Sequence, residues 1–273
     1  MNAQDDYIIK PDVDSDVTTR PVEARDQFGN VLPLNAVQER PLTLFLNSRE
    51  IVTLMSVGDY PDLLGVGYLV NQNMLNKDDV ITAIDYDEEI QTIVIRTEHE
   101  TDYEDKLKRK VLTSGCAMGT IFGDIMDKVE EAHLSTSLKL RASTIAPVLQ
   151  KIKDTPSLYQ KAGSIHGCVL CQGDKPILYT EDVGRHNALD KIAGYLYLNN
   201  LQADDYYLYT TGRLTSEMVI KAVSMGITIV ISRSGSTHWA IELAQKTGLT
   251  LINRARGKRF LVLNDQDRII YDL

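Results

Sequence analysis

The sequence lacks several features that would place it at a membrane or on nucleic acid. None of its apolar runs approaches the roughly 20 residues that a membrane-spanning helix needs, which argues against a membrane protein. Its first residues, MNAQDDYIIKPD, have neither a basic start nor an apolar core, so we expect no secretory signal. Lys and Arg total 29 against 38 Asp and Glu, a net charge of -9, which argues against a general nucleic-acid coat.

Cysteine is also scarce. Three cysteines are too few, and an odd number, for a disulfide framework, and they suit a reducing cytoplasm. We therefore expect a cytoplasmic protein, in which any special chemistry at Cys116, Cys168 or Cys171 is thiol or metal chemistry. The 273 residues lie near the length at which one hydrophobic core usually splits into two.

Two families of catalytic motif are missing. The glycines match neither a P-loop nor a dinucleotide-binding G-x-G-x-x-G. A zinc deaminase needs H-x-E and P-C-x-x-C, but the corresponding strings, His166-Gly167-Cys168 and Gly167-Cys168-Val169-Leu170-Cys171, lack the glutamate and the proline. A zinc hydrolase or deaminase is kept only as an alternative that predicts bound metal.

Three regions follow one another along the chain. Residues 1–40 are polar and predict an extended arm, with edge strands around Tyr7-Ile8-Ile9. Residues 41–135 predict a small α+β domain: two strands that turn at Asn47-Ser48, a helix that begins at Pro61, a hairpin with acidic residues at its tip, and a cysteine loop followed by a helix over 121–133.

Residues 136–273 predict an α/β domain. After a helix over 138–153 that contains Pro147, short apolar runs alternate with helices that begin at Ser or Thr. This alternation predicts a largely parallel sheet with helices on its faces. The last two apolar runs, KRFLVLN and RIIYDL, predict a terminal hairpin.

Cationic side chains gather in four glycine-bearing loops that follow predicted strands: TEDVGRHN, TTGRLTSE, SRSGSTH and NRARGKR. Ligands of parallel α/β sheets bind at the carboxyl ends of strands, so the loops predict a site for an anion such as phosphate or pyrophosphate. The alternative is a set of unrelated surface arginines. The residues concerned are Arg185, His186, Arg213, Arg233, Arg254, Arg256, Lys258 and Arg259.

Cys116 lies in a glycine-flanked loop, TSGCAMGT, just before a predicted helix. The positive end of a helix dipole lowers the pKa of a nearby thiol, which favours a nucleophilic thiolate. The alternative is a small residue in a tight turn.

Cys168 and Cys171 lie in a predicted strand, where three residues span about 10 Å, beyond the roughly 7 Å limit for a disulfide. Their side chains should point to opposite faces, which favours a buried structural role.

Four further residues have a sufficient structural explanation. His186 and His238 each begin a predicted helix, and a capping or ligand-contacting role is favoured over general acid–base catalysis. Glu217 matches the third position of a capping box, and core packing suffices for Trp239.

Long motifs follow one another from about Pro41 to the C-terminus: VTLMSVGDYPDLLGVGYLVNQNML, TSGCAMG, SIHG, EDVGRHNALDKIAG, TTGRLTSEMVIKA, SRSGSTHWAIELA and ARGKRF. In this order they resemble the FdhD/NarQ family of sulfur-carrier accessory proteins for formate dehydrogenase. The resemblance implies that a cysteine desulfurase hands persulfide sulfur to Cys116. The sulfur then passes to the bis-molybdopterin guanine dinucleotide cofactor, with molybdenum or tungsten, before insertion into formate dehydrogenase.

The resemblance also implies a site and a fold. The family's basic loop, which holds the cofactor, corresponds to Arg254, Ala255, Arg256, Gly257, Lys258 and Arg259. The larger domain should be a three-layer α/β unit similar to the cytidine-deaminase fold without its zinc chemistry, and the protein should be a homodimer.

The cysteine loop departs from the family. Many members carry C-x-x-C there, whereas this chain has Cys116-Ala117-Met118-Gly119, so a second loop thiol cannot act. Either Cys116 alone carries the sulfur, which we favour, or Cys168 or Cys171 assists from the sheet. A further alternative is a cofactor-binding chaperone that performs no sulfur chemistry.

Overall fold

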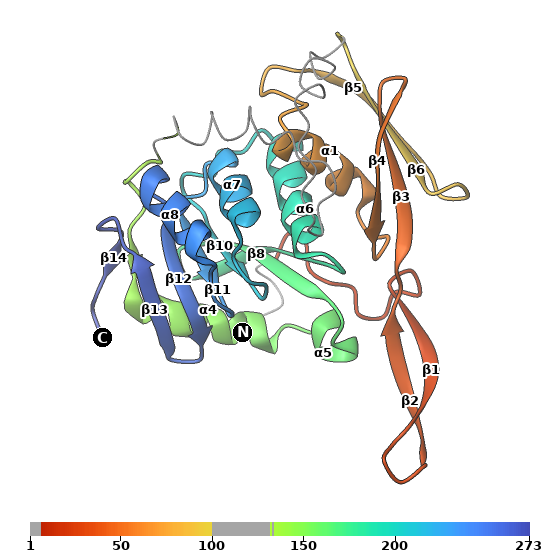
Figure 1. The fold of residues 1–273 in the computed structure, drawn as a ribbon, viewed down its shortest axis with the longest axis horizontal. Helices are drawn as coiled ribbons and strands as arrows, with labels where there is room; N and C mark the ends of the chain where they lie inside the picture. The colour runs from red at the N-terminus through yellow and green to blue at the C-terminus, as the bar shows by residue number, and fades with distance from the viewer. Residues whose placement is uncertain (1–6, 100–131, 133) are drawn as a thin grey trace.

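A computed structural model describes residues 7–99, 132 and 134–273 of the chain. It is a mixed α/β structure with a six-stranded sheet, a four-stranded sheet, a projecting hairpin and one short strand pair (Figure 1). Within the described residues, no helix combines the length and the apolar character needed to cross a membrane.

The six-stranded sheet has the order β13-β12-β11-β10-β8-β9. Only the β10–β11 and β11–β12 pairings are parallel, so the prediction of a largely parallel sheet is wrong. Tight turns at Gly173 and Gly257, both with φ 57°, join β8 to β9 and β12 to β13. Strands joined by a tight turn are antiparallel, because parallel neighbours need a longer crossover connection. The strands are β8 (His166–Gln172), β9 (Lys175–Asp182), β10 (Tyr207–Thr210), β11 (Ile229–Ser232), β12 (Thr250–Arg256) and β13 (Arg259–Asn264).

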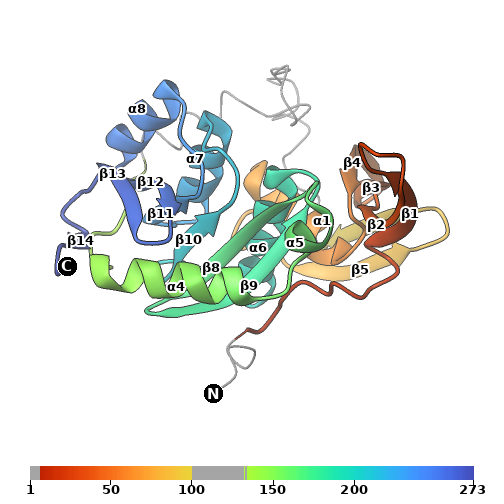
Figure 2. The ribbon, with the colours of Figure 1, turned by 90° about the horizontal axis from the view of Figure 1, so that it is seen from below.

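Helices cover both faces of this sheet. Helices α6 (Arg185–Leu198), α7 (Ser216–Ser224) and α8 (His238–Thr247) lie on one face, and α4 (Ala142–Asp154) lies on the other (Figures 1 and 2). Helix α4 begins four residues later than the expected 138 and contains Pro147. A short helix, α5 (Leu158–Ala162), precedes β8. The expected three layers are therefore present.

The four-stranded sheet confirms the expected strands and helix of the smaller unit. Its order is β4-β3-β6-β5, and helix α1 (Pro61–Asn71) begins at the predicted proline. The strands are β3 (Arg40–Leu46), β4 (Arg49–Ser56), β5 (Ile81–Asp87) and β6 (Thr92–Thr97). The cysteine loop and the helix expected over 121–133 fall almost entirely outside the described residues.

Two glycines bring the units into direct helix contact. A Cβ atom at Gly67 of α1 would lie 1.7 Å from the carbonyl oxygen of Asp190 in α6, and one at Gly194 of α6 would lie 2.0 Å from that of Leu63. Only glycine permits such an approach. As a result, apolar residues of both units share one buried cluster.

The chain ends differ in part from expectation. The region expected as an extended arm contains a hairpin of β1 (Thr19–Arg25) and β2 (Val31–Val37), which projects from the body of the molecule (Figure 1). Ile9 forms only an isolated parallel bridge to Leu178 of β9, so the edge strand expected around Tyr7-Ile8-Ile9 is reduced to a single bridge. The prediction of a terminal hairpin is wrong. Strand β13 pairs with β12, and β14 (Ile269–Ile270) pairs in parallel with β7 (Leu140–Arg141). The reason is that a turn over residues 265–268 directs the chain toward α4.

Candidate functional site

The four basic loops meet at one edge of the six-stranded sheet. Strands β9, β10, β11 and β12 run in the same direction, so their carboxyl ends lie together. Backbone hydrogen bonds join the loops directly: Arg233 N donates to Thr210 O (3.0 Å), and Arg254 N donates to Ser234 O (2.7 Å). The gathering of the loops expected from the sequence is thus confirmed. We call this edge, with the loops at 182–187, 211–216, 233–238 and 253–259, the basic rim.

Arg185 and His186 open helix α6 at the β9 end of the basic rim. His186 is buried, and its Nε2 lies 3.2 Å from the Glu217 carboxylate of α7. Burial lowers the pKa of His186, while Glu217 opposes this effect. The expected capping box is wrong, because the side chain of Thr215, the residue before α7, makes no capping hydrogen bond. Glu217 instead pairs with His186.

His166, at the start of β8, joins the same cluster. Its pKa is lowered first by burial and then by the charges of Arg185, His186 and Arg213. Three cationic or protonatable groups thus lie within electrostatic reach of His166. The sequence indicated all three; His166 was considered there only as a zinc ligand.

One buried donor at this cluster lacks a partner. Arg185 Nε is buried and has no hydrogen-bond partner among the described residues. Gly212 lies against the Arg185 side chain, where an added Cβ would be 2.9 Å from Arg185 Cδ. A buried unpaired donor is costly, and an anionic group is the acceptor that satisfies a guanidinium N–H group best. The residues at the basic rim therefore fit a phosphate-bearing ligand.

The turn between β12 and β13 carries most of the remaining positive charge. Arg254 adopts the left-handed conformation, φ 52°, which is strained for a residue with a side chain. Its neighbour Ala255 is 2% exposed and packs in the core, so its methyl group cannot contact a ligand at the rim. The exposed residues of the turn are Arg254, Arg256, Gly257, Lys258 and Arg259.

The last two predicted contact residues flank the cluster. Arg213 is exposed. Arg233 is half-buried, and its guanidinium carbon lies 5.6 Å from the centre of the Tyr159 ring, within cation–π range. His238 is exposed at the start of α8. Trp239 is 43% exposed, so core packing was the wrong explanation for it.

Cys168 and Cys171 are buried on opposite faces of β8, as expected. Cys168 packs with the cluster under α6 and α7, and Cys171 with the cluster under α4. Burial raises the pKa of Cys168 to about 12 and also raises that of Cys171. Neither thiol is a ready nucleophile at neutral pH. Cys116 lies outside the described residues.

A buried charge network supports the loop that carries Arg185 and His186. Asp182 accepts hydrogen bonds from Ser56 Oγ (2.7 Å) and Asn187 Nδ2 (3.1 Å), and its carboxylate lies 2.6 Å from Lys191 Nζ. Lys191 also contacts Asp59 of the smaller unit. Sequence reasoning missed this network; its signal was the charged residues set between apolar positions of β9 and α6.

Comparisons with known proteins identify similar chains. The family model described as FdhD/NarQ family matches residues 37–270. The chain is 32% identical over 235 residues to the sulfur carrier protein FdhD of Bacillus subtilis, covering 85% of this chain and 89% of that protein. It is 30% identical over 234 residues to the sulfur carrier protein FdhD of Bacillus pumilus, with the same coverage, 85% and 89%.

A solved structure is similar over nearly the whole fold. The crystal structure of a formate dehydrogenase accessory protein from Desulfotalea psychrophila superposes with a TM-score of 0.74 at 25% sequence identity. The alignment covers 92% of this chain and 98% of the other. The matched family model spans both units and all four loops of the basic rim, and on this evidence the chain belongs to the FdhD/NarQ family.

Proposed function

We propose that this protein is a sulfur carrier that serves formate dehydrogenase by delivering sulfur to the bis-molybdopterin guanine dinucleotide cofactor. The observation that carries the proposal is the basic rim, where four loops gather cations around the buried, unpaired Arg185 Nε. The cofactor is the cargo in this scheme. Its pyrophosphates are polyanions, and guanidinium groups bind such oxygens through paired hydrogen bonds.

Sulfur carriage is assigned to Cys116. Its thiolate would attack the terminal sulfur of a persulfide on a cysteine desulfurase, so that a new S–S bond forms on Cys116 and the desulfurase thiolate leaves. In delivery, a nucleophile on the cofactor would accept the terminal sulfur at the sulfane oxidation level, the S–S bond would break, and Cys116 would leave as the thiolate. The raised pKa values of Cys168 and Cys171 support Cys116 as the only carrier.

The chain's own residues would divide the work of binding. Arg185, His186 and Arg213 would hold phosphate oxygens at the end of the basic rim formed by the loops after β9 and β10. Arg233 and the turn carrying Arg254, Ala255, Arg256, Gly257, Lys258 and Arg259 would close around the outer part of the cofactor, with Ala255 contributing through its backbone alone. His166 and Glu217 would set the protonation of the cluster.

The finer expectations from the family are part of the same proposal. They are a cytoplasmic homodimer whose two basic rims are related by a two-fold axis, and a larger unit similar to the cytidine-deaminase fold. The bound metal is molybdenum or tungsten.

The test is Cys116→Ala, with Cys168→Ala as the matched control. Cells that carry only Cys116→Ala should lose formate dehydrogenase activity, whereas cells with Cys168→Ala should keep it. Incubation of the purified protein with a desulfurase and cysteine should add the mass of one sulfur atom to Cys116. Full activity of the Cys116→Ala cells would overturn the proposal.

A cofactor-binding chaperone without sulfur chemistry is the second candidate, because the basic rim does not depend on Cys116. It predicts that no persulfide forms on the protein and that the activity of the cells survives Cys116→Ala. Binding of guanosine diphosphate should survive Cys116→Ala under both candidates, so the persulfide measurement separates them.

A further inference from the structure

Tyr159 lies at the basic rim although it belongs to none of the four loops. It is part of helix α5, which precedes β8, and its side chain is half-buried. The guanidinium carbon of Arg233 lies 5.6 Å from the centre of the Tyr159 ring. The binding residues proposed above do not include Tyr159.

This contact lies on the α4 face of the six-stranded sheet. Tyr209 of β10 is 6% exposed and packs in the apolar cluster under α4. Burial raises the pKa of Tyr209 to about 12, and the nearby charges of Arg233 and Arg256 oppose this rise. Both arginines are therefore close to Tyr209, at the end of the rim that faces α4.

The cations around Arg185 lie on the opposite face. His166 and Cys168 point to the same face of β8, because side chains alternate along a strand. Cys168 packs in the cluster under α6 and α7. Burial lowers the pKa of His166, and the charges of Arg185 and Arg213 lower it further, so these two arginines lie near His166. The basic rim thus presents cations on both faces of the sheet.

The two arginines on the α4 face are neighbours without a counter-ion. Arg256 Nε donates to the backbone oxygen of Arg233 at 3.4 Å. The arginines of the described residues that form ion pairs are Arg96 and Arg141, and no described carboxylate pairs with Arg233 or Arg256. Neighbouring guanidinium groups that lack a carboxylate favour an anionic ligand, and phosphate oxygens accept their hydrogen bonds well.

The protein holds the Tyr159 ring in place independently of the arginine. Glu181 is 1% exposed, and its carboxylate accepts hydrogen bonds from the backbone N–H groups of Leu158 (2.6 Å) and Tyr159 (3.1 Å). The Leu158 side chain is fully buried beside Val57 of the smaller unit. Helix α5 is therefore fixed by a buried carboxylate and by apolar packing, so the ring is a rigid support.

A rigid ring under a guanidinium reduces the cost of binding. A free arginine side chain samples many rotamers, and their loss on binding a ligand costs about 0.5–1.5 kcal/mol. A cation–π contact restricts the side chain before the ligand arrives.

We propose that Tyr159 is a positioning residue, which holds the Arg233 guanidinium for a phosphate group that binds beside Arg256 on the α4 face of the basic rim. This inference rests on the proposed function, since both concern the same polyanionic ligand. Tyr159 acts through Arg233 and does not itself contact the phosphate.

Calorimetric titration of the full-length protein with guanosine diphosphate tests this role. Tyr159→Leu keeps apolar bulk but removes the aromatic ring, so the nucleotide should bind about two- to fivefold more weakly. Tyr159→Phe keeps the ring and should bind it as the native protein does. Arg233→Ala should bind it about tenfold more weakly. Tyr195→Leu, at a half-buried position near the C-terminal end of α6, is the matched control and should leave binding unchanged.

The double variant separates positioning from a structural role. In protein that already carries Arg233→Ala, Tyr159→Leu should cause no further loss of binding, because the guanidinium that it positions is absent. A folding defect, or direct stacking of the nucleotide on the ring, would weaken binding in both backgrounds. That result would overturn the proposal, as would native affinity in Tyr159→Leu.

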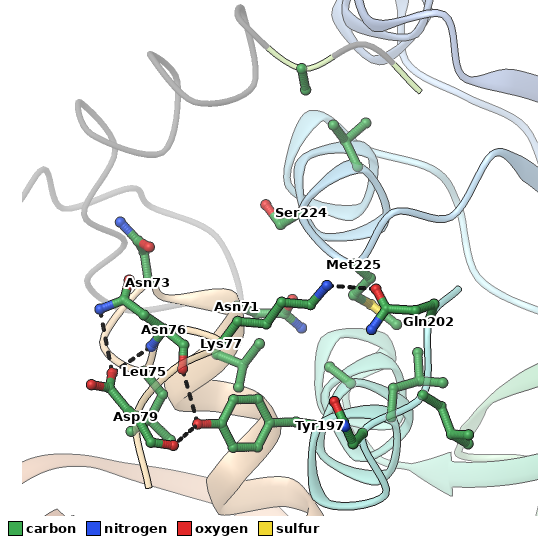
Figure 3. Close-up of a pocket in the computed structure, with 17 residues that line it drawn as sticks. Asn71, Asn73, Leu75, Asn76, Lys77, Asp79, Tyr197, Gln202, Ser224 and Met225 are labelled. Atoms are coloured by element: carbon green, nitrogen blue, oxygen red, sulfur yellow. Dashed lines mark hydrogen bonds between the residues drawn. The ribbon is translucent and has the colours of Figure 1, made fainter. Parts of the chain in front are cut away.

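Failure of the proposed function gives a different result. If the native protein does not bind guanosine diphosphate, or if Arg233→Ala binds it with native affinity, Arg233 does not belong to the cofactor site and the inference falls with that assignment. Lys77→Ala is the charge control. Lys77 is exposed and contacts Gln202 at the ends of α6 and α7 that lie away from the basic rim (Figure 3), so its removal should leave nucleotide binding unchanged.

Discussion

The Lys191 ammonium lies 2.6 Å from the Asp182 carboxylate, and both side chains are completely buried. Lys191 belongs to helix α6, and Asp182 ends strand β9 immediately before the loop that carries Arg185 and His186. Asp59 of the smaller unit reaches the same ammonium. The pair therefore fixes the basic rim to the smaller unit as well as to the sheet.

Lys191→Met should lower the free energy of unfolding by about 3–5 kcal/mol, because it leaves Asp182 buried without its counter-ion. Urea denaturation measures this loss. Lys153→Met, at an exposed position of α4, is the control and should change stability by less than about 0.5 kcal/mol. Equal stabilities of the two variants would show that the buried pair contributes nothing.

Gly67→Ala should prevent α1 and α6 from packing at their present distance. The new methyl group would lie 1.7 Å from the Asp190 carbonyl oxygen, so the helices must separate. We expect a loss of several kcal/mol, seen as a lower thermal midpoint or as insoluble protein. Gly235→Ala is the matched control, since its Cβ would have no neighbour within 4 Å. A normal midpoint for Gly67→Ala contradicts the close packing of the helices.

Glu181 should make stability depend on pH. Burial raises the pKa of Glu181 to about 7. The hydrogen bonds that its carboxylate accepts from the backbone N–H groups of Leu158 and Tyr159 lower the pKa and only partly offset this effect. Between the ordinary pKa of 4.5 and about 7, the folded state therefore binds more protons than the unfolded state. Stability contributed by the protonated group is present at low pH and falls as pH rises through this window.

Glu181→Gln should remove this contribution. The difference in unfolding free energy between the native protein and Glu181→Gln should decrease by up to about 3 kcal/mol from pH 5 to pH 8. Urea denaturation of both proteins at several pH values measures it, and subtraction removes the titration of other groups. A difference that does not vary with pH would refute the raised pKa.

Arg254 should show a conflict between stability and binding. Arg254→Gly relieves the left-handed strain at φ 52°, whereas Arg254→Ala keeps it, so the glycine variant should be more stable than the alanine variant by about 1 kcal/mol. Both variants lose the guanidinium and should bind guanosine diphosphate about tenfold more weakly.

The controls for Arg254 separate strain from charge. Arg96→Ala removes an exposed arginine of β6, far from the basic rim in the fold, and should leave guanosine diphosphate binding unchanged. Unfolding midpoints and calorimetric titrations of all three variants give both quantities. Unchanged nucleotide binding in Arg254→Ala would remove Arg254 from the proposed cofactor site.

The sequence by itself determined the local elements and the identity of the basic loops. Pro61 marked the start of α1, the alternating residues of β8 placed Cys168 and Cys171 on opposite faces, and long motifs in order indicated the family. These features depend on neighbours along the chain, where backbone sterics and side-chain periodicity act directly.

Only the tertiary structure decided how distant side chains meet. The pairing of His186 with Glu217 and the burial of Lys191 between Asp59 and Asp182 each join elements far apart in sequence. The order and direction of the strands were likewise decided by turns and crossovers and not by the pattern within each strand. For this reason the sheet is mixed, whereas the sequence predicted a largely parallel one. Contacts of this kind depend on packing and burial, and the same residues at other depths would have different partners and different pKa values.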